Sequence, residues 1–286
     1  MEGIDCSTRL TGNKASALQN SGISAVGRYL GYKKQKWSKT IAPEEAQAIL
    51  NIGVGIFLIW ESNPTYSGYF KYDKGVSDAR SAIEEAQYLG VPQGIAIYFT
   101  VDYDAQTEDM PAIIDYFRGL ADGMAGQYLI GAYGSYRVLS ALKGSSYPPD
   151  KYYQTYAWSY GQKFPAHIYQ YQNGITLKGI EIDRDTVQPD AGLWLKEDDI
   201  VEHAVIYFTD RDYSSARIVS RKLGNCAMYC RDGVNTNIHP DVKNGIVKHP
   251  VIIGGAEYHD NPNTTNCCGE NAEDTAALAA KYANTL

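Results

Sequence analysis

Short hydrophobic runs alternate with amphipathic stretches along the first two-thirds of the chain. The runs with the length and the β-branched or aromatic content of buried strands are residues 3–6, 25–30, 53–61, 94–102, 128–134, 152–159, 166–172 and 179–185. Between the earlier ones lie helix-compatible segments, and in one of them Ala79, Ile83, Ala86 and Leu89 recur at helical spacing. Eight strands with intervening helices predict a compact α/β fold, a (β/α)₈ barrel of the TIM type over residues 1–197. Because the late connections are short, we expect reduced or absent helices after the sixth and seventh strands.

The pattern restarts after residue 197. Residues 204–209 and 249–255 read as strands, and residues 213–223 and 272–286 read as helices. We therefore predict a second, small α/β domain over residues 198–286.

Composition narrows the classes of function. The 286 residues are 44% hydrophobic and 21% charged, which is typical of a globular protein. A formal charge of −7 argues against nucleic acid as a partner, because phosphate binding depends on concentrated Lys and Arg. No apolar run is long enough to span a bilayer, so we expect no membrane insertion. The sequence contains 24 Tyr and 6 Phe, and a Tyr ring with its hydroxyl suits a sugar surface.

Polar side chains gather where the predicted strands end. In a (β/α)₈ barrel the working residues lie at the carboxyl ends of the strands. The side chains at those ends are Asp5, Arg28, Glu61, Asp102, Asp104, Tyr133, Trp158, Gln170 or Gln172, and Asp183. Crowded carboxylates raise one another's pKa, and glycoside hydrolysis needs one protonated and one assisting carboxyl group. The alternative is that these acids cap helices or pair with Arg9, Arg28 and Arg184.

Four of these strand motifs carry a family resemblance. "GIDCS", "GRYL", "YFTVDYD" and "IEIDRD" resemble a glycoside-hydrolase-like barrel family that is described as a domain of unknown function and is similar to the family-25 lysozymes (N-acetylmuramidases). The likeness spans nearly all of residues 1–195. It implies a barrel with catalytic acids at positions that match Asp5, Asp102 with Asp104, and Asp183.

The resemblance also assigns roles. Family-25 lysozymes have a Glu as proton donor where this sequence has Asp104, one methylene shorter, and misplacement by about an ångström can cost about a hundredfold in rate. We expect Asp104 to be the general acid, with Asp102 assisting it or positioning water. Asp5 and Asp183 would shape the site and tune the acid. Side chains expected to contact substrate are Arg28, Glu61, Tyr133, Trp158 and Gln170.

Four of the five cysteines fall in the small C-terminal unit: Cys226, Cys230, Cys267 and Cys268. Their spacings, C-x₃-C and C-C, fit no standard zinc pattern, so we expect no metal and no cofactor. Disulfides are the favoured interpretation, ahead of free thiols. This unit also resembles the cell-wall-binding repeats of Gram-positive surface proteins and phage lysins, through a strand–helix–strand–Gly-Gly pattern.

These observations predict a lysozyme-like glycoside hydrolase of the endolysin or autolysin type that cleaves a β-1,4 glycan, with peptidoglycan or a related cell-wall glycan as its partner. We expect it to act at the cell wall or outside the cell. Its N-terminus lacks the regions of a classical signal peptide, so we expect release by lysis or a non-classical route. The alternatives are a glycan-binding barrel without catalysis, and a structural protein of a surface layer, virion or spore. Sequence alone leaves the oligomeric state open.

Overall fold

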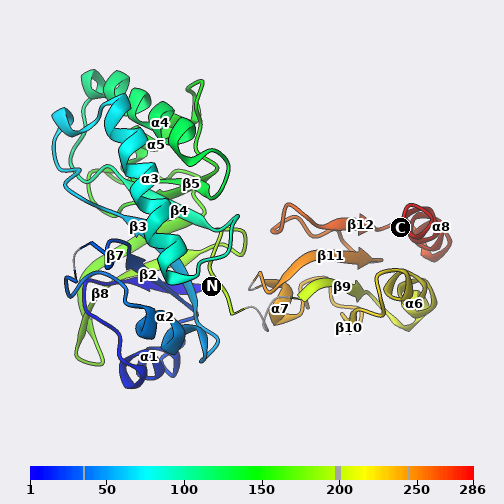
Figure 1. Ribbon diagram of the computed structural model, residues 1–286. Coiled ribbons are helices and arrows are strands. Elements are labelled where there is room, and N and C mark those ends of the chain that lie inside the picture. Colours follow the sequence, from blue (N-terminus) through cyan, green and yellow to red (C-terminus); the bar gives the residue numbers. More distant parts are fainter. Residues whose placement is uncertain (35, 197–200, 244) are drawn as a thin grey trace. The chain divides into compact units, whose positions relative to one another are not determined.

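The computed structural model describes residues 1–286 except 35, 197–200 and 244 (Figure 1). The chain divides into two compact units, one formed by Met1–Val187 with Ala191–Lys196 and the other by Gln188–Asp190 with Glu197–Leu286. The boundary that the sequence predicts between residues 197 and 198 lies outside the described residues. No helix in the described part of the chain is long and apolar enough to cross a bilayer.

The first unit is a closed eight-stranded barrel, which confirms the predicted fold class. Its strands follow one another around the barrel in chain order. They are β1 (Glu2–Asp5), β2 (Ala25–Tyr29), β3 (Gly55–Trp60), β4 (Ala96–Thr100), β5 (Leu129–Gly134), β6 (Lys151–Gln154), β7 (Ile168–Leu177) and β8 (Ile180–Val187). The helices that cover it are α1 (Gly12–Gln19), α2 (Pro43–Leu50), α3 (Tyr72–Leu89), α4 (Met110–Met124) and α5 (Tyr136–Lys143). The described residues between β6 and β8 contain no helix, as the short connections predict.

Strand β8 departs from the regular (β/α)₈ pattern because it runs antiparallel to both of its neighbours, β1 and β7. The expectation that Asp183 ends the last strand is therefore wrong, since β8 continues to Val187 and enters the barrel from the mouth. Its register pairs Asp183 with Asp5 and Asp185 with Gly3. A carboxylate two residues later in sequence consequently lies deeper in the barrel.

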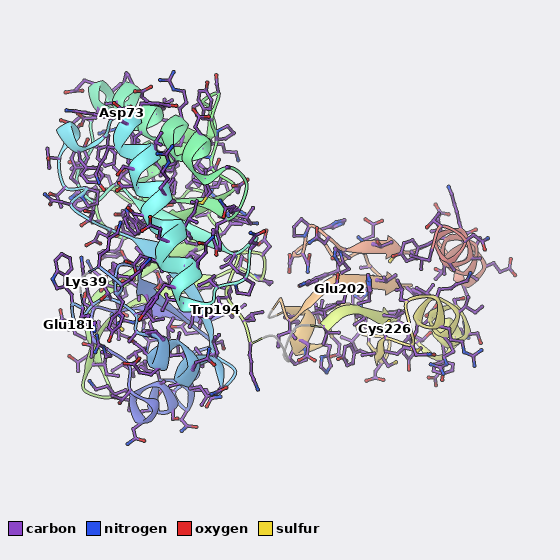
Figure 2. The ribbon with its side chains drawn as sticks, in the orientation of Figure 1. Lys39, Asp73, Glu181, Trp194, Glu202 and Cys226 are labelled. Carbon is purple, nitrogen blue, oxygen red and sulfur yellow. The ribbon has the colours of Figure 1, made fainter. Side chains whose placement is uncertain are left out.

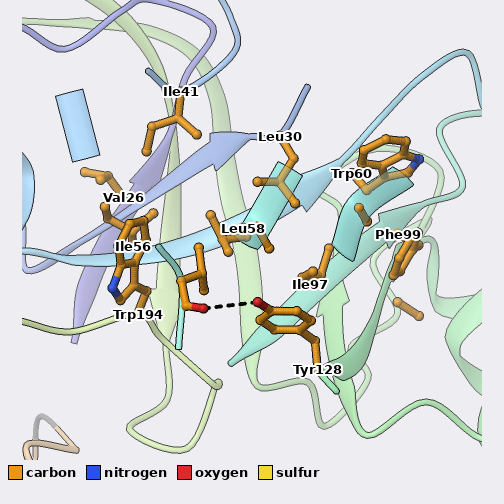
Figure 3. Close-up of a cluster of buried hydrophobic side chains, with 14 of the residues drawn as sticks. Val26, Leu30, Ile41, Ile56, Leu58, Trp60, Ile97, Phe99, Tyr128 and Trp194 are labelled. Carbon is orange, nitrogen blue, oxygen red and sulfur yellow. Dashed lines mark hydrogen bonds between the residues drawn. The ribbon is translucent and has the colours of Figure 1, made fainter. Parts of the chain in front are cut away.

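The wall of the barrel separates two hydrophobic clusters. In β3, Phe57 and Ile59 belong to the cluster inside the barrel, whereas Ile56, Leu58 and Trp60 belong to the cluster between strands and helices (Figure 3). The alternation follows from the two-residue period of a strand. At the edge of the outer cluster, the Tyr128 hydroxyl donates to the carbonyl of Val91 at 3.1 Å.

Glycines make room for aromatic rings inside the barrel. A Cβ at Gly27 would collide with the ring of Phe57, and a Cβ at Gly131 would collide with the ring of Tyr98. Both rings pack edge-on against Tyr153, with centroids 5.7 Å and 5.8 Å away. The lower interior is therefore filled by a tightly fitted aromatic layer.

The C-terminal unit contains a four-stranded parallel sheet in the order β10-β9-β11-β12. The strands are β9 (Val201–Tyr207), β10 (Ala227–Cys230), β11 (Val247–Ile253) and β12 (Thr265–Cys267), with helices α6 (Tyr213–Lys222), α7 (Pro240–Lys243) and α8 (Ala272–Ala283). Helices α6 and α8 pack on one face, and α7 packs on the other. Elements β10, β12 and α7 were not predicted from the sequence, and each has only three or four residues.

The cysteines of this unit do not pair. All five cysteines of the chain lie in the described residues, and each is a free thiol. The preference for disulfides is therefore wrong, and the second interpretation, free thiols, describes the structure. Burial is the main reason that the pKa of the Cys267 thiol is raised to about 11.

Candidate active site

A cavity of about 170 Å³ opens at the carboxyl ends of the parallel barrel strands. We call it the central cavity. Its lining side chains are Asp5, Tyr29, Ile59, Glu61, Thr100, Asp102, Tyr133, Tyr153, Gln170 and Asp183. Six of the residues expected at the site are therefore brought together: Asp5, Glu61, Asp102, Tyr133, Gln170 and Asp183.

Asp5, at the end of β1, is the most enclosed of the lining acids, with 6% of its surface exposed. Its Oδ2 accepts hydrogen bonds from the Tyr153 hydroxyl at 2.7 Å and from Gln170 Nε2 at 3.0 Å. Burial, followed by the charge of Asp183, raises the pKa of Asp5 to about 7. This carboxyl group can therefore change its protonation state near neutral pH.

Asp185 lies below Asp5 and shares a hydroxyl group with it. The Tyr153 oxygen is 2.7 Å from Asp5 Oδ2 and 2.9 Å from Asp185 Oδ1. Burial and the two acids raise the pKa of Tyr153 well above its usual value, so the phenol keeps its single proton. One proton cannot serve two anionic acceptors, so one of the two carboxyl groups must carry a proton of its own. Asp185 is fully buried and its pKa is raised well above the usual range, mainly by burial, which identifies it as the protonated partner.

Gln170, on β7, connects the acids of β1 and β8. Its Nε2 donates to Asp5 at 3.0 Å and to Asp183 at 2.9 Å. Its Oε1 accepts from the Thr155 hydroxyl at 3.2 Å and from the backbone N–H of Tyr156 at 3.0 Å. Because both ends of the amide are engaged, its orientation is set and the two carboxylates are held in place.

Asp102 and Glu61 occupy the other side of the cavity. Lys39 lies close to both, and its Nζ contacts Glu61 Oε1 at 2.7 Å. Figure 2 labels Lys39 on the barrel unit. Burial and the charge of Glu61 raise the pKa of Asp102 to about 6, against an opposing effect of Lys39. Asp102 is thus a half-buried acid at the cavity wall with a pKa close to neutral.

Asp104 is not among the residues that line the central cavity. Strand β4 ends at Thr100, so the alternation that would place Asp102 and Asp104 on one face does not extend to them. The Asp104 carboxylate accepts a hydrogen bond from the Tyr160 hydroxyl at 2.6 Å, and Tyr160 is 74% exposed. Both residues follow the carboxyl ends of strands, so Asp104 lies at the outer rim of the mouth.

Arg28 and Trp158 also lie outside the lining. Arg28 is fully buried on the helix side of the wall, where its Nε contacts Glu45 Oε1 at 2.8 Å and its Nη1 donates to the carbonyl of Cys6. The expected substrate contact from Arg28 is therefore replaced by a buried ion pair with Glu45 of α2, which is not one of the acids at the strand ends. Trp158 lies in the loop after β6 with φ at 55°, and Tyr160 in the same loop has φ at 49°. Positive φ at bulky residues is strained and recurs at functional sites.

Two further hollows adjoin the central cavity. One, of about 360 Å³, shares Asp5, Tyr29 and Asp183 with it and is also lined by Ser7 and Glu181. The other, of about 210 Å³, shares Glu61 and is lined by Trp37 and Trp60; we call it the tryptophan hollow. The mouth therefore offers a reacting position with space on both sides.

The sequence analysis missed Tyr29, Tyr153 and Asp185. Tyr29 and Tyr153 stand on strands where alternate residues face inward, and Asp185 follows Asp183 at the same spacing of two. Counting that alternation along each strand would have identified all three as inward-facing.

The family profile described as "Rv2525c-like, glycoside hydrolase-like domain" matches residues 16–187, more than half of the chain. The chain belongs to this family. Two curated relatives come from Bacillus subtilis (strain 168). The uncharacterized protein FadG is 34% identical over 149 residues, which are 49% of this chain and 26% of FadG. The uncharacterized protein YbfG is 36% identical over 143 residues, which are 46% of this chain and 20% of YbfG.

A crystal structure of a glycoside hydrolase-like relative supports the fold. The Tat-secreted protein Rv2525c of Mycobacterium tuberculosis, in complex with L-tartrate, is similar with a TM-score of 0.59 and 20% identity. The likeness covers 68% of this chain and 98% of that one. The match to FadG and YbfG, by contrast, spans about a quarter or less of those longer proteins.

Proposed function

We propose that this glycoside hydrolase-like barrel is an enzyme that cleaves a β-1,4 glycan of the cell wall, with peptidoglycan as the substrate. The observation that carries the proposal is the central cavity, in which Asp5 and Asp102 have pKa values of about 7 and about 6. Glycoside hydrolysis requires a carboxylic acid that is still protonated near neutral pH, together with a second carboxylate.

We assign the proton donor to Asp102. It is half-buried at the cavity wall, so it can reach a glycosidic oxygen and keeps part of its proton at the pH where the enzyme would work. It would protonate the leaving oxygen as the glycosidic C–O bond breaks, and a water oxygen would finally take the place of the leaving sugar at the anomeric carbon. Asp183 would be the assisting carboxylate, because it lines the cavity and accepts hydrogen bonds from Gly174 N–H at 2.7 Å and Gln170 at 2.9 Å. Burial raises the pKa of Asp183, and the Gly174 hydrogen bond opposes this effect. Asp5 would tune Asp183 through the hydrogen bonds that both carboxylates accept from Gln170 Nε2.

The family resemblance favours Asp104 as the proton donor. Its position at the outer rim of the mouth supports a role in substrate binding instead. Its bond to Tyr160 can order the loop after β6, so Asp104 would contact sugar outside the reacting position. Glu61, Tyr133 and Gln170 line the cavity and would bind substrate there.

The C-terminal unit is proposed as the wall-binding module. A cavity of about 770 Å³ lies where β9 and β11 end, lined by Thr209, Arg211, Gly254, Gly255 and Asn271 among others. Ligands of open parallel sheets bind in such crevices at the carboxyl ends of strands. The secreted nature of Rv2525c supports action outside the cell or at the wall. Loss of wall association after removal of residues 200–286 would support this assignment.

The test of the enzyme uses purified full-length protein and peptidoglycan from several Gram-positive walls. New reducing ends are followed by mass spectrometry. We expect release by the wild type, a loss of at least about a hundredfold in Asp102→Asn, and a change of less than about threefold in Asp104→Asn. The reverse order of the two variants would return the donor role to Asp104. Equal release by all three proteins would contradict an acid at this strand end.

A glycan-binding barrel without catalysis is the second candidate. The observation in its favour is that Asp104, which stands where family-25 lysozymes have their donor Glu, bonds to Tyr160 and does not line the cavity. Binding of wall glycan without release, unchanged in Asp102→Asn, would select this candidate.

A further inference from the structure

The tryptophan hollow is separate from the reacting position but joined to it. Glu61 lines both spaces, with Trp37, Trp60 and hydroxyl-bearing side chains such as Ser62 and Ser77 around the hollow. Its volume of about 210 Å³ corresponds to roughly seven water molecules at about 30 Å³ each. That is room for one sugar ring.

Trp37 gives this hollow an exposed aromatic face. The side chain is 48% exposed. An apolar ring of this kind, beside hydroxyl and ammonium groups, suits the C–H face and the hydroxyl rim of a pyranose.

The loop that carries Trp37 is held by a buried charge. Glu85 of α3 is fully buried, and its carboxylate accepts the backbone N–H groups of Lys33 at 2.8 Å and Lys34 at 3.1 Å. Arg9 donates to the Trp37 carbonyl at 3.2 Å. These hydrogen bonds anchor the backbone at Lys33, Lys34 and Trp37. A backbone that is ordered before a ligand arrives lowers the entropic cost of binding.

The charges around the hollow are already paired. Lys74 contacts Asp78 at 2.6 Å, Lys34 contacts Glu84 at 3.7 Å, and Lys39, beside the hollow, contacts Glu61 at 2.7 Å. A charged occupant would have to displace one of these partners. A neutral, hydroxyl-rich occupant can use the remaining N–H donors and carboxylate oxygens without breaking any pair.

We propose that the tryptophan hollow is a second sugar-binding subsite that takes a neutral pyranose ring of the same glycan whose neighbouring ring lies in the central cavity. The proposal rests on the proposed function for its substrate class. It adds that the glycan must extend past Glu61 and that Trp37 is the stacking platform. A glycan with rings on both sides of the reacting position would then be cleaved internally.

The test measures binding and does not depend on turnover. Full-length protein carrying Asp102→Asn is titrated with chitotetraose, a neutral β-1,4-linked oligosaccharide, by calorimetry. Trp37→Ala in this background is expected to weaken binding by about tenfold, and Trp37→Phe by threefold or less. The matched control is Tyr88→Ala, because Tyr88 is also 48% exposed but does not line the hollow.

The outcomes separate this proposal from the proposed function. Unchanged affinity in Trp37→Ala, an equal loss in Tyr88→Ala, or no chitotetraose binding at all would overturn the subsite. Binding that depends on Trp37 in a protein that releases no reducing ends from walls would overturn the enzyme and leave the subsite standing. Circular dichroism and thermal unfolding of Trp37→Phe show whether the loop variant remains folded.

Discussion

Buried carboxylates lie on both sides of the barrel wall, and the two sides treat them differently. On the helix side, Glu45 meets Arg28 at 2.8 Å and the N–H of Leu10 at 2.8 Å, and Asp78 meets Lys74 at 2.6 Å. Inside the barrel, the neutral donors Tyr153 and Gln170 contact Asp5, and another acid lies close by.

This difference in surroundings distinguishes acids that stabilise the fold from acids that can take part in a reaction. A buried charge with a cation or several N–H donors is compensated and stabilises one geometry. A buried acid whose neighbours are neutral groups and other acids is held close to its protonated form. An acid of the second kind can exchange a proton during a reaction. In the described part of the barrel unit, the acids whose pKa is raised lie in the interior and at the mouth.

The largest change in stability is expected on the helix side of the wall, where the buried carboxylates are paired with cations. Arg28→Met removes the buried cation that Glu45 contacts at 2.8 Å and leaves it only the partly exposed Arg9 at 3.9 Å. This should lower the free energy of unfolding by about 3–5 kcal/mol in urea denaturation. Lys39→Met is the control, because it breaks the more exposed pair with Glu61 and should cost less than about 1 kcal/mol. Equal costs in the two variants would contradict the distinction between the two sides.

The next effect is a pH dependence of the free energy of unfolding, which arises from an acid at the mouth of the barrel. The pKa of Asp102 is raised in the folded state to about 6, so between about pH 4 and pH 6 the folded protein holds more protons there than the unfolded chain. Its contribution to stability is present below the unfolded pKa and is lost as the pH rises through about 6. We compare the free energy of unfolding of Asp102→Asn with that of the wild type by urea denaturation at pH 4.5 and at pH 8. The difference should shift in favour of the variant by about 1–2 kcal/mol from the lower to the higher pH. The same difference in the free energy of unfolding at pH 4.5 and at pH 8 would argue against a raised pKa of Asp102.

A third effect, of similar size, compares the same isosteric change on each side of the barrel wall. Asp185→Asn keeps a donor facing Tyr153, so the free energy of unfolding at pH 7 should change by less than about 1 kcal/mol. Glu85→Gln weakens the acceptor of two backbone N–H groups and should cost about 1–3 kcal/mol. The reverse order in thermal or urea unfolding would mean that Asp185 is ionised.

The smallest effect concerns the rim. Tyr160→Phe removes the hydrogen bond to Asp104 from a largely exposed side chain, so stability should stay within about 0.5 kcal/mol of the wild type. If Asp102 is the proton donor, the rate of release from walls should change by less than about threefold. A loss of more than tenfold would show that the position of Asp104 matters to the chemistry.

The strand pattern predicted the barrel because alternating β-rich and helical segments leave few other folds, and the positions at strand ends predicted Asp5, Glu61, Asp102, Tyr133 and Gln170 at the mouth. Local sequence does not encode strand direction, so the antiparallel β8 and the depth of Asp185 could not be foreseen.

Arg28 and Asp104 were expected in the site but do not line the cavity, and each departure has a local cause. Arg28 alternates to the outer face of β2, where the buried Glu45 of α2 meets it, and that pairing is visible only in three dimensions. Asp104 depends on where β4 stops, and strand ends are the least predictable part of a periodic pattern.

The pairing of Gly27 with Phe57 and of Gly131 with Tyr98 sets a limit on pocket redesign. A side chain added at either glycine meets a ring, and a ring removed leaves a void beneath the acids. Engineering a deeper or differently shaped pocket in this scaffold therefore requires exchanging such positions in pairs, glycine together with aromatic. A single substitution at one of these four positions is expected to be destabilising, through a clash at a glycine or a void at a ring.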